Sequence, residues 1–113
     1  MTNQELIAKA KEVMTKAYAP YSHFQVGAAL LAKDGRVFTG CNVENATYGA
    51  TICAERTAVT KAVSEGVRKF EKIAIVASSG DYAAPCGICR QVLFEFMPEG
   101  KVVLWSELEG EKE

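Results

Sequence analysis

Two short cysteine clusters place the strongest restriction on how this chain can fold. The first is Cys53-Ala54-Glu55 and the second is Pro85-Cys86-Gly87-Ile88-Cys89. The Cys-x-x-Cys pair can chelate one metal ion, and Cys53 can supply a third sulfur if the fold brings the two clusters together. Zinc normally has four ligands, and a catalytic zinc site leaves one of them to water. Three thiolates fit such a site if no fourth protein ligand closes it.

Glu55 favours a catalytic interpretation of these clusters. One residue separates it from the first candidate ligand, Cys53, and from there its carboxylate can move protons to and from a water molecule at the open position. Cys-x-Glu followed by Pro-Cys-x-x-Cys is similar to the signature of zinc-dependent deaminases in its three-cysteine form. Each half of this pattern is a weak signal alone, whereas the two halves together are a strong one.

Hydrophobic periodicity predicts an α/β fold with three layers, in one domain spanning residues 1–113. Apolar residues at helical spacing predict helices over 3–17, 53–65 and about 86–96. Compact apolar runs predict strands over 24–32, 36–43, 72–78 and 102–105. The Asp34-Gly35 pair is a tight-turn signal and predicts that the first two strands form a β-hairpin. The predicted order is α-β-β-α-β-α-β, a mixed β-sheet packed with helices.

The predicted helix starts coincide with the cysteines, and this favours ionised sulfur. Helix N-termini present free N–H groups and partial positive charge, which lower the pKa of a thiol. Three thiolates around Zn²⁺ still make a net negative centre, so a nearby cation is needed. Arg56, next to Glu55, can donate hydrogen bonds to ligand sulfurs and withdraw electron density from the metal. The alternative is a surface salt bridge, and the residues alone do not decide between the two roles.

Composition indicates a globular protein that acts on a small molecule. Apolar residues make up 49% of the chain, charged residues make up 24%, and the net charge is −1. This charge gives no electrostatic footprint for a nucleic acid polymer or an acidic membrane. No apolar run approaches the roughly 20 residues of a membrane span, and the first residues lack the order of a signal peptide. We therefore expect a cytoplasmic protein, in which a cysteine cluster is more often metal-binding or catalytic than disulfide-bonded.

Four segments of the chain together resemble cytidine deaminase, in its small, homotetrameric, three-cysteine type. They are Phe24-Gln25-Val26-Gly27-Ala28-Ala29, Gly40-Cys41-Asn42-Val43-Glu44-Asn45-Ala46, Cys53-Ala54-Glu55-Arg56-Thr57-Ala58 and Pro85-Cys86-Gly87-Ile88-Cys89-Arg90-Gln91. The resemblance runs from about residue 5 to residue 105. It implies a five-stranded sheet packed with helices and a homotetramer. It also implies hydrolysis of cytidine or deoxycytidine to the uridine product with release of ammonia, as in pyrimidine salvage.

The resemblance assigns the chemistry to the two cysteine clusters. Zn²⁺ would be the cofactor, with Cys53, Cys86 and Cys89 as its ligands. Glu55 would take a proton from the zinc-bound water, protonate N3 of the base, and later deliver a proton to the leaving amine. Arg56 would act on the ligand sulfurs.

The resemblance assigns substrate binding to residues at the two ends of the predicted hairpin and at the start of the helix that follows. Asn42 and Glu44 would hydrogen-bond the ribose hydroxyls. Phe24 would pack against the pyrimidine ring, although by pattern alone it fits the core equally well. The backbone of Ala54 would contact the base edge.

Two other functions remain open from the residues. A purely structural zinc module would need a fourth ligand, for which Cys41 and His23 are the available candidates. A deaminase of another aminopyrimidine nucleoside would share the same site. Members of the family also continue past the last predicted strand with a Leu-Leu-Pro-x-x-Phe-like segment, which the sequence does not contain. From that difference we expect a more open nucleoside pocket.

Overall fold

The computed structural model describes residues 1–78, 87–106 and 110–112. Its elements are α1 (Asn3–Met14), β1 (Val26–Ala32), β2 (Val37–Cys41), the short 3-10 helix η1 (Tyr48–Ala50), α2 (Ala54–Ser64), β3 (Phe70–Ala77), α3 (Gly87–Phe96), β4 (Lys101–Ser106) and β5 (Gly110–Lys112). The predicted order α-β-β-α-β-α-β is confirmed. The structure adds η1 before α2 and β5 after β4, neither of which the periodicity predicted.

One mixed sheet forms the middle of the molecule, with the strand order β2-β1-β3-β4-β5. β1 pairs antiparallel with both β2 and β3, and β4 pairs antiparallel with β5. β3 and β4 are parallel, and α3 lies in the connection between them. The predicted hairpin is present, with Leu31 opposite Val37 and the turn glycine, Gly35, at a φ of 94°. A positive φ costs glycine little, which explains the Asp-Gly signal.

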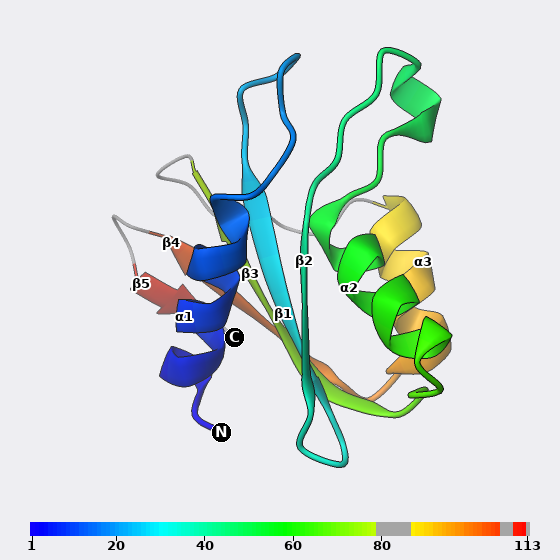
Figure 1. Ribbon diagram of the computed structural model, residues 1–113. Coiled ribbons are helices and arrows are strands. Elements are labelled where there is room, and N and C mark those ends of the chain that lie inside the picture. Colours follow the sequence, from blue (N-terminus) through cyan, green and yellow to red (C-terminus); the bar gives the residue numbers. More distant parts are fainter. Residues whose placement is uncertain (79–86, 107–109, 113) are drawn as a thin grey trace.

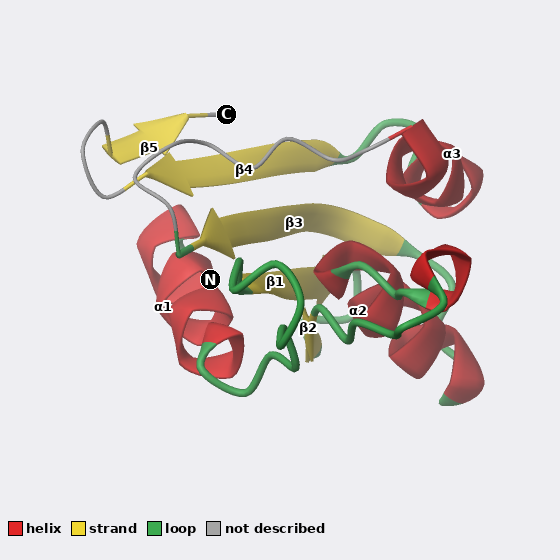
Figure 2. Cartoon of the chain, turned by 90° about the horizontal axis from the view of Figure 1, so that it is seen from above, coloured by secondary structure: helices red, strands yellow, loops and turns green. Residues whose placement is uncertain are grey.

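Helices cover both faces of this sheet, as the two views in Figure 1 and Figure 2 show. α1 lies on one face, and α2 and α3 lie together on the other. Every residue of β1 is buried, because successive side chains point to opposite faces and both faces are covered. Leu30 and Ile75 belong to the core beneath α2 and α3, whereas Leu31 and Val76 belong to the core beneath α1. The layered arrangement is therefore α/β/α.

The first helix is shorter than the apolar spacing predicted. Thr2 and Glu5 form a capping box at its start, and it ends at Met14 rather than near residue 17. Tertiary hydrogen bonds explain the early end. The Tyr18 amide donates to the Asn42 carbonyl over 3.0 Å, and the Glu44 amide donates to the Tyr18 carbonyl over 2.9 Å. These bonds hold residue 18 beside residues 42–44 in an extended conformation, so the helix cannot continue.

The start of α2 is in close contact with strand β2. A Cβ added at Gly40 would lie 2.5 Å from both the Ala54 carbonyl oxygen and the Ala58 amide nitrogen. Real Cβ atoms do not approach backbone atoms this closely, so only glycine fits between β2 and the first turns of α2. This contact fixes the height of the helix N-terminus above the sheet.

Among the described residues, no helix combines the length and the apolar character needed to cross a membrane.

Candidate active site

The N-termini of α2 and α3 bring two of the three predicted metal ligands to the same side of the sheet. Cys53 is the N-cap residue of α2, with extended backbone and no capping hydrogen bond from its sulfur. Cys89 is the third residue of α3 and is fully buried. Neither forms a disulfide. Cys86, the third predicted ligand, lies outside the described residues.

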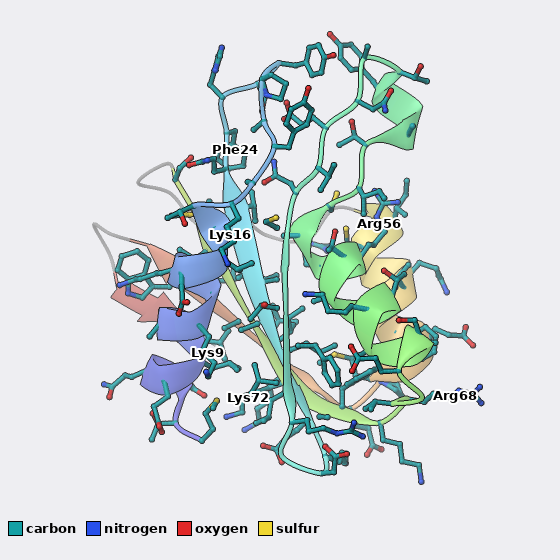
Figure 3. All side chains as sticks on the ribbon, viewed as in Figure 1. Lys9, Lys16, Phe24, Arg56, Arg68 and Lys72 are labelled. Atoms are coloured by element: carbon teal, nitrogen blue, oxygen red, sulfur yellow. The ribbon has the colours of Figure 1, made fainter. Side chains whose placement is uncertain are left out.

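Arg56 links the two described thiols. Its Nη2 donates to the Thr51 carbonyl over 3.1 Å and lies 3.5 Å from the Cys53 sulfur. Hydrogen bonds to Cys53 and, more weakly, to Cys89 raise the pKa of Arg56, so the guanidinium is firmly charged. Its Nε is buried and has no acceptor within the described part of the chain. Figure 3 shows Arg56 at the first turn of α2, on the side of α3, whereas Arg68 points outward at the far end of the molecule. Among the described residues Arg56 forms no salt bridge, and its contacts favour the predicted role at the ligand sulfurs.

Glu55 is a buried carboxyl group in the first turn of α2, with 5% of its surface exposed. Burial raises its pKa, because removal from water disfavours the charged form. Its own backbone N–H, a hydrogen bond with the Cys89 thiol, and the charge of Arg56 act in the opposite direction. A carboxyl group whose pKa is raised by burial takes up a proton more readily than an exposed one, which favours a role as a general acid–base catalyst.

The two spare candidates for a fourth ligand do not join this group. His23 is exposed in the loop before β1, at a φ of 59°. Cys41 is the last residue of β2. Among residues 1–78, 87–106 and 110–112, no three His, Cys, Asp or Glu side chains come together as a metal-binding group, so neither Cys41 nor His23 closes a site with Cys53 and Cys89.

The predicted sugar-binding residues lie in the segment between β2 and α2, and both are hydrogen-bonded within the protein. The buried Asn42 side chain accepts from the Val26 amide over 2.9 Å and donates to the Phe24 carbonyl over 2.8 Å. Glu44 accepts from the Tyr21 amide over 3.0 Å and from the Ser22 amide over 3.1 Å. Sequence reasoning missed Tyr21 and Ser22, because they carry no motif and meet Glu44 only through the fold.

The residues predicted to contact the base lie at the edge of the same region. Phe24 has 38% of its surface exposed, so it is not a core residue. Figure 3 shows it in the loop before β1. Ala54 is the fully buried first residue of α2.

A pocket of about 220 Å³ opens between the two loops that carry these residues. It is lined by Tyr21, Ser22, Glu44, Tyr48 and Thr51. The Tyr21 and Tyr48 rings meet edge to face, with centroids 6.5 Å apart. The Thr51 carbonyl also accepts the hydrogen bond from Arg56, so one residue of the pocket lining contacts the side chain that lies beside the Cys53 sulfur.

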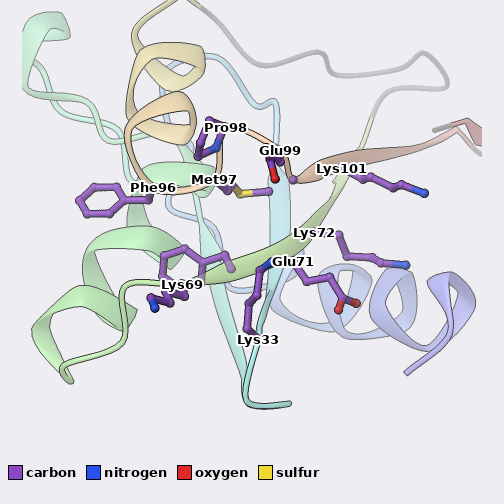
Figure 4. A pocket seen from close by; sticks show the side chains of 11 residues that line it. Lys33, Lys69, Glu71, Lys72, Phe96, Met97, Pro98, Glu99 and Lys101 are labelled. Atoms are coloured by element: carbon purple, nitrogen blue, oxygen red, sulfur yellow. The ribbon is translucent and has the colours of Figure 1, made fainter.

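A larger pocket of about 460 Å³ lies at the opposite end of the sheet, and it contains none of the predicted site residues. Its lining comes from the ends of β1 and α3 and the starts of β3 and β4: Lys33, Lys69, Phe70, Glu71, Lys72, Phe96, Met97, Pro98, Glu99, Gly100 and Lys101. Lys72 and Lys101 point away from Lys69 (Figure 4). These cationic groups do not converge on one point, so volume alone does not make this pocket a functional site.

Comparisons with known proteins agree with the site at the two helix N-termini. A family model described as the cytidine and deoxycytidylate deaminase zinc-binding region matches residues 1–105. The chain is 50% identical to a cytidine deaminase of Sporosarcina psychrophila over 113 residues, which cover 100% of this chain and 83% of the relative. It is 52% identical to a cytidine deaminase of Halalkalibacterium halodurans over 111 residues, 98% of this chain and 84% of the relative. A crystal structure of cytidine deaminase from Burkholderia pseudomallei superposes with a TM-score of 0.94 at 50% identity, covering 99% of this chain and 91% of that one.

Proposed function

Because the chain belongs to the cytidine and deoxycytidylate deaminase family, whose members are hydrolytic deaminases, we propose that it deaminates cytidine and deoxycytidine in pyrimidine salvage. Residues 1–113 would form its catalytic domain. The observation that carries the proposal is the Glu55 carboxyl group, which is buried in the first turn of α2 and interacts with the Cys89 thiol of α3. The direct test incubates purified protein with cytidine and measures released ammonia and the loss of cytidine absorbance.

Zinc would be held by Cys53, Cys86 and Cys89. The described part of the site fits this ion, because two thiols lie at helix N-termini and both interact with the cationic Arg56. These features favour thiolates, the form of cysteine that binds zinc. When bound, zinc acts as a Lewis acid that lowers the pKa of a water molecule toward neutral pH.

Glu55 would move the protons of the reaction. Its carboxylate accepts a proton from the water that attacks C4 of the cytosine ring and passes that proton to N3. It then takes the proton of the new C4 hydroxyl and delivers it to the exocyclic amine, so that the C4–N bond breaks, ammonia leaves and the C4 carbonyl of uridine forms. Burial of Glu55 supports this role, because a raised pKa brings the carboxyl group closer to the pH at which it must exchange protons.

The nucleoside would bind between the loop before β1 and the segment between β2 and α2. Glu44 and Asn42 would contact the sugar hydroxyls, Phe24 would pack against the pyrimidine, and the Ala54 backbone would contact the base edge. The exposed face of Phe24 and the pocket beside Glu44 support this placement.

Replacing Arg56 with glutamine is expected to leave zinc in place but to lower kcat by about 10- to 100-fold, the usual cost of losing a partner of the metal ligands. Glutamine keeps a donor for sulfur but removes the positive charge that offsets the thiolates. Elemental analysis and steady-state kinetics measure the two effects. Arg68→Gln is the matched control, because Arg68 is exposed and distant from the site. Equal kinetics for both variants would remove Arg56 from the catalytic group.

The protein would assemble as a homotetramer with active sites near the subunit contacts. Large apolar side chains are exposed on the loops around the site and on the outer side of α3: Tyr18, Tyr21, Phe24, Val43, Tyr48, Ile52, Ile88 and Phe94. Exposed apolar surface of this kind favours association, and closed symmetry is its usual outcome. Sedimentation at micromolar concentration should give a mass about four times that of the chain. An active monomer under these conditions would contradict the proposal.

A further inference from the structure

Two loops that lie far apart in the sequence meet at the same end of the sheet. One precedes β1 and the other joins β2 to α2, and they stand side by side in Figure 1. A parallel bridge pairs Tyr18 with Val43, and the rings of Tyr21 and Tyr48 contact each other. The nucleoside pocket therefore depends on how these loops are held together.

The Glu44 carboxylate holds the first loop through three hydrogen bonds. Its Oε1 accepts from the backbone amides of Tyr21 and Ser22, and its Oε2 accepts from the Ser22 hydroxyl. The hydroxyl is the largest influence that lowers the pKa of Glu44, followed in the same direction by the two amides, so the group is charged at neutral pH. An ionised carboxylate offers about four acceptor positions. Three are filled from within the protein, which leaves one on Oε2.

The Ser22 hydroxyl also connects Glu44 to the other predicted nucleoside contacts. Its oxygen accepts from the Phe24 amide over 3.0 Å. The Phe24 carbonyl in turn accepts from the Asn42 side chain over 2.8 Å. A continuous chain of hydrogen bonds thus runs from Glu44 through Ser22 and Phe24 to Asn42, and Ser22 is the member that no motif identifies.

We propose that Ser22 is a positioning residue whose hydroxyl orients the Glu44 carboxylate toward the sugar hydroxyls of the nucleoside. This inference rests on the proposed function, because it takes the sugar as the ligand of Glu44. With Oε2 held by Ser22, its remaining acceptor position has a fixed direction. Without the hydroxyl, Oε1 is still held by two amides but Oε2 can turn away from the sugar.

The test compares substrates with and without the sugar hydroxyls. In Ser22→Ala, kcat/KM for cytidine should fall about fivefold to tenfold through a higher KM, which matches the loss of one oriented hydrogen bond. The value for 2′,3′-dideoxycytidine should change less than about twofold, because that substrate has no 2′ or 3′ hydroxyl to donate to Glu44. Ser22→Thr keeps the hydroxyl and should restore the preference for cytidine. Ser64→Ala is the matched control, since the Ser64 hydroxyl donates to the Lys61 carbonyl at the far end of α2.

Binding of the reaction products separates this inference from the proposed function. Calorimetry with uridine and 2′,3′-dideoxyuridine requires no turnover, and Ser22→Ala should weaken only uridine binding. If the parent protein releases no ammonia from cytidine, yet Ser22→Ala selectively weakens the binding of uridine, the proposed function fails and the role of Ser22 stands. An equal loss of affinity for uridine and for 2′,3′-dideoxyuridine would mean that Ser22 acts through Phe24 or through folding. That result, or no loss at all, overturns the inference.

Discussion

Glu55→Gln is expected to lower kcat for cytidine by about 10³-fold, within the range that general acid–base catalysis contributes. Glutamine has nearly the same shape as glutamate, and it can still occupy the buried position in the first turn of α2. It cannot accept a proton, however, so the attacking water, N3 and the leaving amine all lose their proton carrier. Steady-state kinetics with cytidine measures the effect, and elemental analysis should show unchanged zinc.

The matched control is Glu65→Gln. Glu65 is the exposed C-cap residue of the same helix, so this variant makes the same chemical change away from the site. It should retain the parent kinetics. If Glu55→Gln retained activity within about tenfold of the parent, well short of the expected loss, another group would have to move the protons.

Cys53→Ser is expected to abolish both zinc binding and activity while leaving the helix intact. Serine is among the best N-cap residues, so it can replace Cys53 at the start of α2 without weakening the helix. Its hydroxyl is a poor ligand for zinc compared with a thiolate. Elemental analysis should give about one zinc per parent chain and much less in the variant. Because a ligand stabilises the state that binds it, added zinc should raise the melting temperature of the parent but not of Cys53→Ser.

Cys41→Ser tests whether any cysteine substitution would have the same result. Cys41 ends β2 and belongs to no metal-binding group within the described residues. This variant should keep its zinc and its activity. Full zinc occupancy in Cys53→Ser would show that Cys53 is not a ligand and that the ion is held elsewhere.

Local chemistry made most of the fold predictable. Asp34-Gly35 predicted the hairpin because the turn needs a residue that tolerates a positive φ, and Gly35 has one. Buried strands such as β3 could be predicted from continuous apolar runs, because helices cover both of their faces. The end of α1 could not be predicted, since it depends on hydrogen bonds between Tyr18 and residues 42–44. β5 pairs with β4 in only three residues and lacks an apolar pattern.

The candidate site also has parts that the sequence could predict and parts that it could not. Glu55 and Arg56 were candidates because they follow Cys53 by two and three residues, and the first turn of α2 keeps them close to it in space. The placement of Cys53 and Cys89 at helix N-termini also followed from the sequence, whereas Cys86 stays a prediction. Ser22 could not be predicted, because it meets Glu44 across 22 residues of chain and its role exists only after folding.

The close contact at Gly40 has a consequence for redesigning the enzyme's specificity. The helix that carries Cys53 and Glu55 rests directly on strand β2, where an added methyl group would strike backbone atoms of α2. The residues proposed to contact the sugar and the base lie mainly in loops that leave the sheet, held by side-chain hydrogen bonds. Libraries that vary residues 18–24 and 43–50 can therefore alter which nucleoside is accepted, while the catalytic groups and the Thr51 carbonyl that Arg56 binds stay in place. A larger residue at Gly40 would displace those groups whatever the substrate.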